Sequence, residues 1–327
     1  MKKKLLMLLF CFACVVKAWS QQDAQFSQYM FNGIYINPAY AGYREVWNAH
    51  AFYRNQWSSF PGAPKTISFA VDGVAHEKRY GIAFQAVNDK IGLQDNASMY
   101  ANFAVRIPIE YEESGKTLSF GIGAGVIQNR IRVDEFDPTS DPVGDDPTLY
   151  NAVATRFTPD ASIGVFYNSN SFYAGISADN LITSAYDSKN TSQNPFAERK
   201  IHMYFTAGAL LPVSEVLQFK PTILLKEDFA GPTSLDINAF MLLNEKLWIG
   251  AGYRTSVFNK SLIQDDLKKS GAVIGMVELF LGQKIRVGYA YEYSINNSTM
   301  NNYPTNEISI SYFFINPKAA MYSPRYF

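Results

Sequence analysis

The sequence predicts an all-β protein: a transmembrane antiparallel β-barrel of about 14 strands, with a short N-terminal segment near the periplasmic mouth. Three observations predict this fold, namely an export signal at the start, alternation of apolar and polar residues along many segments, and a sorting of the connections by length. The expected organisation is a signal peptide at 1–20, an N-terminal periplasmic segment or plug at 21–42, the barrel at 43–314 and a tail at 315–327.

The first 20 residues have the pattern of a cleaved secretory signal peptide. Lys2 to Lys4 precede an apolar run from Leu5 to Val16, and Ala18 and Ser20 are small residues just before Gln21. About a dozen apolar residues are too few for a membrane-spanning helix, which takes roughly 20. We therefore expect the mature chain to begin at Gln21.

Both cysteines, Cys11 and Cys14, lie inside this apolar run. A lipoprotein with Cys14 as the lipidated residue is an alternative, but Cys11 stands where such a signal usually has a leucine. The expected mature chain contains no cysteine, which excludes disulfides, thiolate nucleophiles and cysteine-ligated metals.

Charge and hydropathy narrow the class of protein further. The chain has 29 basic and 29 acidic residues, and removal of four lysines with the signal peptide leaves 25 against 29, a net charge of about −4. This balance argues against a nucleic-acid partner. The sequence has 15% aromatics and a mean hydropathy of −0.11, but no second apolar run long enough for a helical span, so it can cross a membrane only as a barrel.

Strict alternation, the pattern of a strand with two different faces, recurs downstream of Tyr43. In residues 93–107, Phe103 and Ile107 fall on one face, and Asn102 and Arg106 fall on the other. We expect about 14 such strands, starting near Val46, Lys65, Tyr80, Leu93, Thr117, Asp160, Phe172, Ile201, Leu217, Leu235, Leu247, Ala272, Lys284 and Glu307.

The connections distinguish a barrel from a soluble β-sandwich, whose strands also alternate. Counted from a periplasmic N-terminus, the even connections include the tight turns 168–171, 212–216, 244–246 and 281–283, although Asp72 to Arg79 and Pro108 to Lys116 are longer. The odd connections include the long loops 130–156, 180–200, 255–270 and 294–306. Short periplasmic turns and long extracellular loops are typical of transmembrane barrels, and we expect both termini to be periplasmic.

The segment 21–42 is too short to be a domain, yet its apolar residues must be buried somewhere. Tucked into the periplasmic mouth, it would plug the barrel, and the Asn37-Pro38 pair predicts a turn before the first strand. The residues expected to form the plug or bind a partner are Gln25, Phe26, Gln28, Tyr29, Met30, Phe31, Asn32, Asn37, Pro38 and Tyr40.

The polar faces of the strands predict a lumen with charges of both signs, which either line an aqueous channel or pair across it. A purely structural role is the alternative, because any barrel of this size needs polar filling. The residues expected in this lumen polar network are Arg54, Gln56, Arg106, Asp160, Asp179, Arg254, Arg286 and Glu292, and Asn102, Lys220, Lys226 and Asp236 share the same faces.

Catalytic and metal sites are not expected. Two of the three histidines, His50, His76 and His202, alternate to the lumen side, but no serine is placed beside them as an outer-membrane lipase would need. The loop from Asp134 to Asp146 holds six carboxylates, which could bind calcium, but its spacing is not that of an EF-hand and a solvated loop is the alternative. We predict no cofactor and no enzyme activity.

Several motifs resemble the PorP/SprF family of type IX secretion system outer-membrane proteins of the Bacteroidetes, a phylum with gliding, adhesin-secreting members. The N-terminal motifs are QFSQYMFN at 25–32, INPAYAG at 36–42, RNQW at 54–57 and GAPKT at 62–66. Further matches are PDASIGVFYNSNSFYAGISADNL at 159–181, LWIGAGYR at 247–254, IRVGYAYEYS at 285–294 and NEISISYFF at 306–314. One departure is the tail after Phe314, because a barrel-assembly signal normally ends the chain.

The resemblance implies an outer-membrane protein that aids export or surface attachment of adhesins with C-terminal secretion domains, as in gliding motility. Its implied partners are outer-membrane lipid, type IX components on the periplasmic side and the adhesin's C-terminal domain. The alternative function is a passive porin or hydrophobic-solute channel, which requires an open lumen. An outer-membrane lipid-modifying enzyme is a third hypothesis that lacks a convincing catalytic arrangement. The sequence does not identify the secreted client, the stoichiometry or whether the lumen is open.

Overall fold

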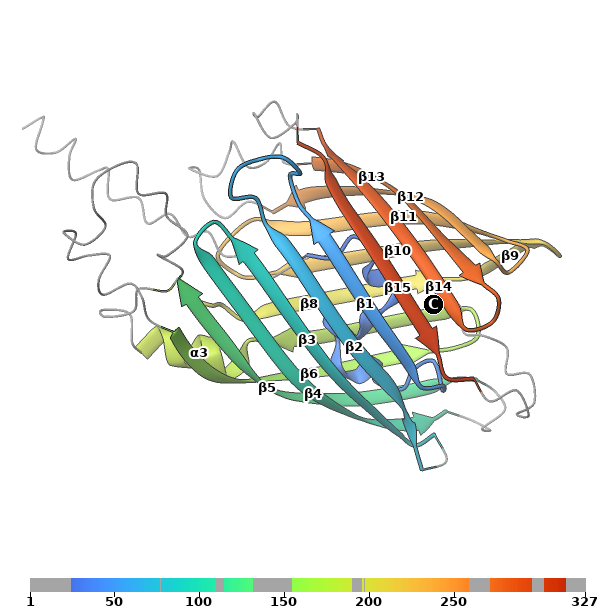
Figure 1. Cartoon of the computed structure of the whole chain (residues 1–327). Coiled ribbons are helices and arrows are strands. Elements are labelled where there is room, and N and C mark those ends of the chain that lie inside the picture. Colours follow the sequence, from blue (N-terminus) through green and yellow to red (C-terminus); the bar gives the residue numbers. More distant parts are fainter. Residues whose placement is uncertain are drawn as a thin grey trace, which may run out of the picture.

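The protein folds into a β-barrel, shown by a computed structural model (Figure 1). The structure describes residues 25–76, 78–109, 115–131, 155–189, 196, 198–258, 271–295 and 303–315. The strands are β1 (Asn48–Asn55), β2 (Lys65–Ala75), β3 (Tyr80–Ile91), β4 (Gln94–Pro108), β5 (Thr117–Ile131), β6 (Thr155–Asn168), β7 (Phe172–Asp179), β8 (His202–Ala209), β9 (Leu211–Ser214), β10 (Leu217–Glu227), β11 (Thr233–Leu243), β12 (Leu247–Val257), β13 (Gly271–Leu281), β14 (Ile285–Ser294) and β15 (Thr305–Phe313).

The barrel is closed and antiparallel throughout, with neighbouring strands in chain order. β8 and β9 both pair with β10 and form one strand interrupted at Leu210, so the wall has 14 strands, and β15 pairs with β1 to close it. The predicted fold class is therefore confirmed. Most predicted strand starts fall within two residues of the observed ones, but β6 begins at Thr155 rather than near Asp160.

The two faces of the wall differ as the alternation predicts. On β4 and β5, Phe103 is 41% and Ile122 61% exposed on the outside, whereas Asn102 and Ser119 are 3% and 2% exposed on the inside. An outward band of Ile, Val, Phe and Tyr side chains surrounds the barrel, as lipid contact requires.

The longest connections follow β1, β5, β7, β12 and β14, at the end of the barrel where the two-residue turn between β3 and β4 also lies. The opposite end has mostly short turns, with the longer connection 109–116 between β4 and β5 as the exception. The connection expected from Asp72 to Arg79 is shorter, because β2 continues to Ala75. Within the predicted loop 180–200, the structure forms a short helix that the sequence pattern did not predict, α3 (Leu181–Lys189). Among the described residues, no helix has the length and apolar content needed to cross a membrane.

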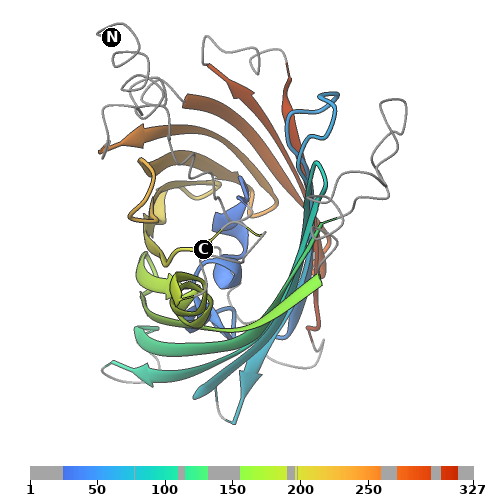
Figure 2. The ribbon, with the colours of Figure 1, turned by 90° about the vertical axis from the view of Figure 1, so that its left-hand side faces the viewer.

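The N-terminal segment lies inside the barrel, as Figure 2 shows along the barrel axis. It contains three 3₁₀ turns, η1 (Tyr29–Phe31), η2 (Gly33–Tyr35) and η3 (Pro38–Tyr40), before the chain enters β1. The predicted signal peptide at 1–20, residues 21–24, the acidic loop from Asp134 to Asp146 and the tail beyond residue 315 lie outside the described residues.

Candidate functional site inside the barrel

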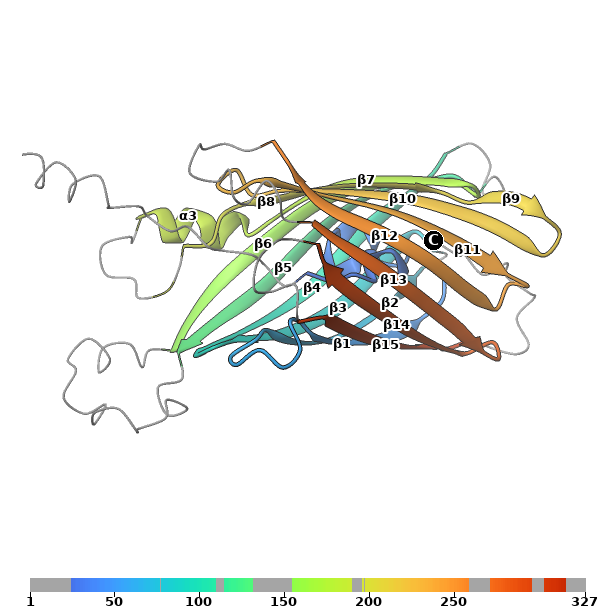
Figure 3. The same ribbon diagram turned by 90° about the horizontal axis from the view of Figure 1, so that it is seen from above.

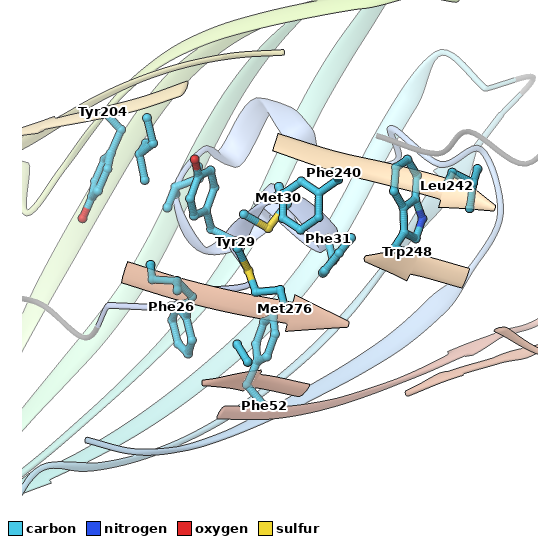
Figure 4. Close-up of a cluster of buried hydrophobic side chains, with 14 residues drawn as sticks. Phe26, Tyr29, Met30, Phe31, Phe52, Tyr204, Phe240, Leu242, Trp248 and Met276 are labelled. Atoms are coloured by element: carbon cyan, nitrogen blue, oxygen red, sulfur yellow. The ribbon is translucent and has the colours of Figure 1, made fainter. Parts of the chain in front are cut away.

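Residues 25–45, called the plug below, occupy the lumen between opposite walls (Figure 3). Their apolar side chains form the core of the molecule. Phe26 stacks on Phe52 of β1 with ring centroids 5.1 Å apart, and Phe31 meets Phe240 of β11 edge-on at 5.5 Å. Figure 4 shows this cluster, whose other members include Tyr29, Met30, Tyr204, Leu242, Trp248 and Met276.

Asparagines shape the turns of the plug. The side chain of Asn32 accepts a hydrogen bond from the N–H of Ile34, and that of Asn37 accepts one from Ala39, so each begins a 3₁₀ turn as an N-cap. Pro38 takes the first helical position, where its missing N–H costs nothing. Asn37 also donates to the carbonyl oxygen of Val165 at 3.0 Å, which attaches the turn to β6.

Glu307 of β15 holds the start of the plug. Its carboxylate accepts hydrogen bonds from the backbone N–H groups of Ser27 at 2.8 Å and Gln28 at 2.9 Å. The same carboxylate lies 3.1 Å from Arg54 of β1, and both side chains are 1% exposed. Gln28 further donates to the backbone oxygen of Glu307.

The contacts continue along the wall through alternating charges. Glu292 of β14 accepts from Arg54 at 3.0 Å, from Arg254 at 2.9 Å and from the hydroxyl of Ser27 at 2.9 Å. Arg254 in turn binds Asp236 through two nitrogens. We call this set the clamp: Ser27, Gln28, Arg54, Asp236, Arg254, Glu292 and Glu307.

A second charged group lies nearer the short turns. The Lys220 ammonium donates to the backbone oxygen of Met30 at 3.3 Å and faces the rings of Phe31 and Trp248. Arg286 lies between the rings of Phe280 and Phe313, and its Nη1 is 3.9 Å from Glu278. Arg44 of the plug donates to the carbonyl oxygen of Phe31 and lies over the ring of Phe313, so it joins Lys220 and Arg286 in a largely aromatic setting.

The remaining predicted lumen residues belong to other clusters. Arg106 pairs with Glu45 of the plug at 3.0 Å near the short turns. Asp160 accepts from the N–H groups of Ile182 and Thr183 and so caps α3, while Tyr100 donates to its other oxygen at 2.6 Å. Gln56 lies just past β1, and its N–H donates to Pro64.

Asp179 ends β7, opposite His202 in the register. The eight predicted residues therefore divide among several places rather than forming one network. The sequence analysis did not single out Ser27, Glu307, Glu45, Arg44 or Glu278 as site residues. Alternation alone places Glu307 and Glu278 inward, in line with Ser309 and Met276, but it carries no signal for residues of the plug.

Glycines in the wall let the plug approach closely. A Cβ placed on Gly121 of β5 would lie 2.2 Å from the nitrogen of Ala39, and one on Gly164 of β6 would lie 2.1 Å from the Asn37 side chain. Any other residue at these positions would have to displace the plug or its own strand.

The plug is held to the wall by ring contacts, ion pairs and hydrogen bonds. Burial raises the pKa of the Tyr29 phenol well above its ordinary value, and its oxygen accepts from Asn238 at 2.9 Å. Among the described residues, no group of three or more His, Cys, Asp or Glu side chains could hold a metal ion. His50 packs against the ring of Phe52, and His202 contacts Asn180 at 3.1 Å.

Comparison with known proteins gave one family. The model described as "Type IX secretion system membrane protein PorP/SprF" matches residues 18–312. The sequence has no significant match among curated proteins.

Among solved structures, the chain is similar to the outer membrane protein Omp33 of Acinetobacter baumannii, with 8% identity and a TM-score of 0.44, covering 84% of this chain and 100% of that chain. It is also similar to BamA of Haemophilus ducreyi lacking POTRA domains 1-3, with 8% identity, a TM-score of 0.42 and coverage of 83% and 71%. A third similar structure is the KdgM porin, with 6% identity, a TM-score of 0.38 and coverage of 82% and 99%.

Proposed function

The chain belongs to the PorP/SprF family of type IX secretion system membrane proteins, and on that premise we propose that it is a plugged, non-catalytic barrel that aids export or surface attachment of adhesins with C-terminal secretion domains. Its place is the outer membrane, because the family and the closed barrel with an apolar outer band agree on it.

The occupied lumen is the observation that carries this proposal. Aromatic side chains of the plug are almost fully buried against several strands, and the clamp fixes its start to β1, β14 and β15. A barrel filled in this way offers surfaces rather than a passage. That property suits a component that holds partners on its two sides.

Each face of the barrel fits one class of partner. The outward apolar band contacts outer-membrane lipid. The end with the long connections faces the cell surface, as in other bacterial barrels, and meets the secreted adhesin's C-terminal domain. The end with the short turns faces the periplasm and meets other secretion components.

A passive porin or hydrophobic-solute channel is the second candidate. It would require a continuous path along the lumen, and the buried plug argues against one. The described hollows beside the plug are local recesses lined by plug and wall together.

Export of a reporter fused to an adhesin C-terminal secretion domain tests the proposal. In a strain lacking the gene, the wild-type chain should restore release or surface display of the reporter, and the tagged chain should co-purify with secretion components identified by mass spectrometry. A variant with residues 25–32 replaced by an equally long Gly-Ser stretch should assemble but lose export. Normal export in the strain lacking the gene would overturn the proposal.

A further inference from the structure

The outer face of the wall carries a group of cations at the end with the long connections. Lys65 is the first residue of β2, Lys90 the last but one of β3 and Arg130 the last but one of β5, and all three are exposed. They alternate in step with outward apolar residues of the same strands, such as Ile67 of β2 and Val126 of β5. The three cations therefore lie on the membrane side of the wall and not on the lumen side.

The strand register brings these cations into one row. Lys65 is directly opposite Lys90 in the pairing of β2 with β3. Lys90 is in turn opposite Asp95 of β4, which is opposite Arg130. The four strands are neighbours in the wall (Figure 1), and strands lie about 4.8 Å apart, so the row spans about 15 Å. We call Lys65, Lys90, Asp95 and Arg130 the cationic row.

The cationic row has more positive charge than its own carboxylate balances. Lys65 has Lys90 on one side and the uncharged Asn55 of β1 on the other. Asp95 is the one carboxylate among the four residues, and it also accepts a hydrogen bond from the amide of Asn88 at 2.7 Å. Like charges directly opposite each other on adjacent strands are destabilising. An anion between Lys65 and Lys90 would remove this repulsion.

The carboxylate next in the chain does not neutralise the row, because it lies on the other face of the wall. Asp89 is 9% exposed inside the barrel, where the hydroxyl of Thr66 donates to it at 2.6 Å. In the part of the chain that the structure describes, Lys65, Lys90 and Arg130 form no ion pair. Their charge is therefore available to an external anion.

The height of the row on the wall indicates which anion it meets. Ile67, the next outward residue of β2, is 57% exposed, and Phe69 after it is 46% exposed. Two residues of a strand rise about 6.7 Å, so Lys65 lies just beyond the apolar band. The headgroup layer on each side of a bilayer core of about 30 Å is about 5 to 7 Å thick. The cationic row thus lies at the level of lipid headgroups.

The charge belongs to one side of the barrel. At the same end of the wall, Leu235 of β11 is opposite Thr255 of β12, which is opposite Gly271 of β13. These three residues continue the outward positions of their strands and carry no charge. A general interfacial belt of cations would include them, so the row on β2 to β5 is a local feature.

We propose that the cationic row binds the phosphate groups of a lipid headgroup, with one phosphate between Lys65 and Lys90. The inference rests on the topology of the proposed function, which places the row in the outer leaflet and makes the phosphorylated glycolipid of that leaflet its ligand. Lysine binds phosphate as a compact charge, and Arg130 can donate two parallel hydrogen bonds to a second phosphate group. The apolar stems of these side chains pack along the band while their charged ends reach the headgroup.

Binding of lipid A to the purified, folded barrel in detergent tests the proposal. The probe is bisphosphorylated lipid A, and the comparison ligand is the same lipid with both phosphates removed. A double variant, Lys65→Gln with Lys90→Gln, removes the opposed pair. The matched control is Lys246→Gln with Lys284→Gln, two exposed lysines in turns at the other end of the barrel. A further variant, Asp95→Asn, removes the carboxylate of the row.

We expect the wild type to prefer the phosphorylated lipid. The double variant should raise the dissociation constant about thirtyfold, which is the contribution of two cations near an anionic lipid surface. The control pair should bind as the wild type does, and Asp95→Asn should bind more tightly. Equal binding of the two lipids by the wild type, or equal dissociation constants for the double variant and the control pair, would overturn the proposal.

Inorganic phosphate distinguishes a lipid from a free anion. Added at the concentration of the lipid, it should not displace lipid A from the wild type, and displacement would overturn the assignment to a lipid. The assay contains no secretion component, so loss of the lipid preference leaves the proposed function standing. Failure of the wild type to restore reporter export would overturn the proposed function and leave the measured lipid preference in place.

Discussion

The carboxylate of Glu307 on the last strand lies 3.1 Å from the guanidinium of Arg54 on the first, and the two residues are directly paired in the register that closes the barrel. The same carboxylate accepts the N–H groups of Ser27 and Gln28. One buried side chain thus joins closure of the barrel to seating of the plug.

Glu307→Gln is expected to loosen the plug and weaken the closing seam. Removing one partner of a buried ion pair typically costs about 3–5 kcal/mol, because the other charge stays buried. The free energy of unfolding, measured by denaturant titration in detergent, should fall by a few kcal/mol, and channel activity should rise. Glu245→Gln, in an exposed turn, is the control. If the two variants lower the free energy of unfolding by the same small amount, the clamp does not hold the plug as described.

Gly121→Ala is expected to displace the plug while Gly275→Ala is tolerated. A Cβ at Gly121 would lie 2.2 Å from Ala39, whereas at Gly275 of β13 nothing lies within 4 Å. Overpacking typically costs about 1–3 kcal/mol. Limited proteolysis of the plug should accelerate for Gly121→Ala alone. Identical protection in the two variants would contradict the close approach of η3 to β5.

Ile122→Arg is expected to impair barrel assembly, because this side chain is 61% exposed on the lipid face. A cation at mid-membrane costs roughly 2 to 4 kcal/mol there. The assembled fraction, read from heat-modifiable migration on gels, should drop, whereas Ile122→Leu should assemble normally. Normal assembly of the arginine variant would mean that this face does not meet lipid.

The phenol of Tyr29 is expected to stay protonated in the folded protein at alkaline pH. Burial raises its pKa, so the folded state binds the proton more tightly than the unfolded chain does. Its contribution to stability is complete below a pH of about 10 and declines as the pH rises above that value, because only the unfolded chain then ionises. Tyr29→Phe should flatten this decline in unfolding free energy, and an unchanged decline would contradict the burial.

The alternation of apolar and polar residues predicted the wall, because successive side chains of a strand between lipid and lumen face the two in turn. Thr117 and Leu247 begin β5 and β12 as predicted. The start of β6 was missed because Pro159 interrupts the pattern. Only Ile163 to Asn168 of β6 pair with β7. Pro159 lies before that stretch, so its missing N–H removes no hydrogen bond to β7.

The site was harder to predict than the wall. The apolar motif at 25–32 indicated a buried segment, but its path depends on contacts far apart in sequence, such as Ser27 with Glu307. Likewise α3 has little helical pattern of its own. The N-terminus of α3 is held by the Asp160 carboxylate, which belongs to β6 and not to the strand that precedes the helix.

Ion conductance in planar bilayers tests the central claim, a lumen closed by its own N-terminal segment, most directly. The wild-type barrel is compared with the variant whose residues 25–32 are replaced by an equally long Gly-Ser stretch. We expect little or no conductance from the wild type and stable open channels from the variant, because the 14-stranded wall closes without the plug. High conductance of the wild type, or equal conductance of the two, would contradict the claim.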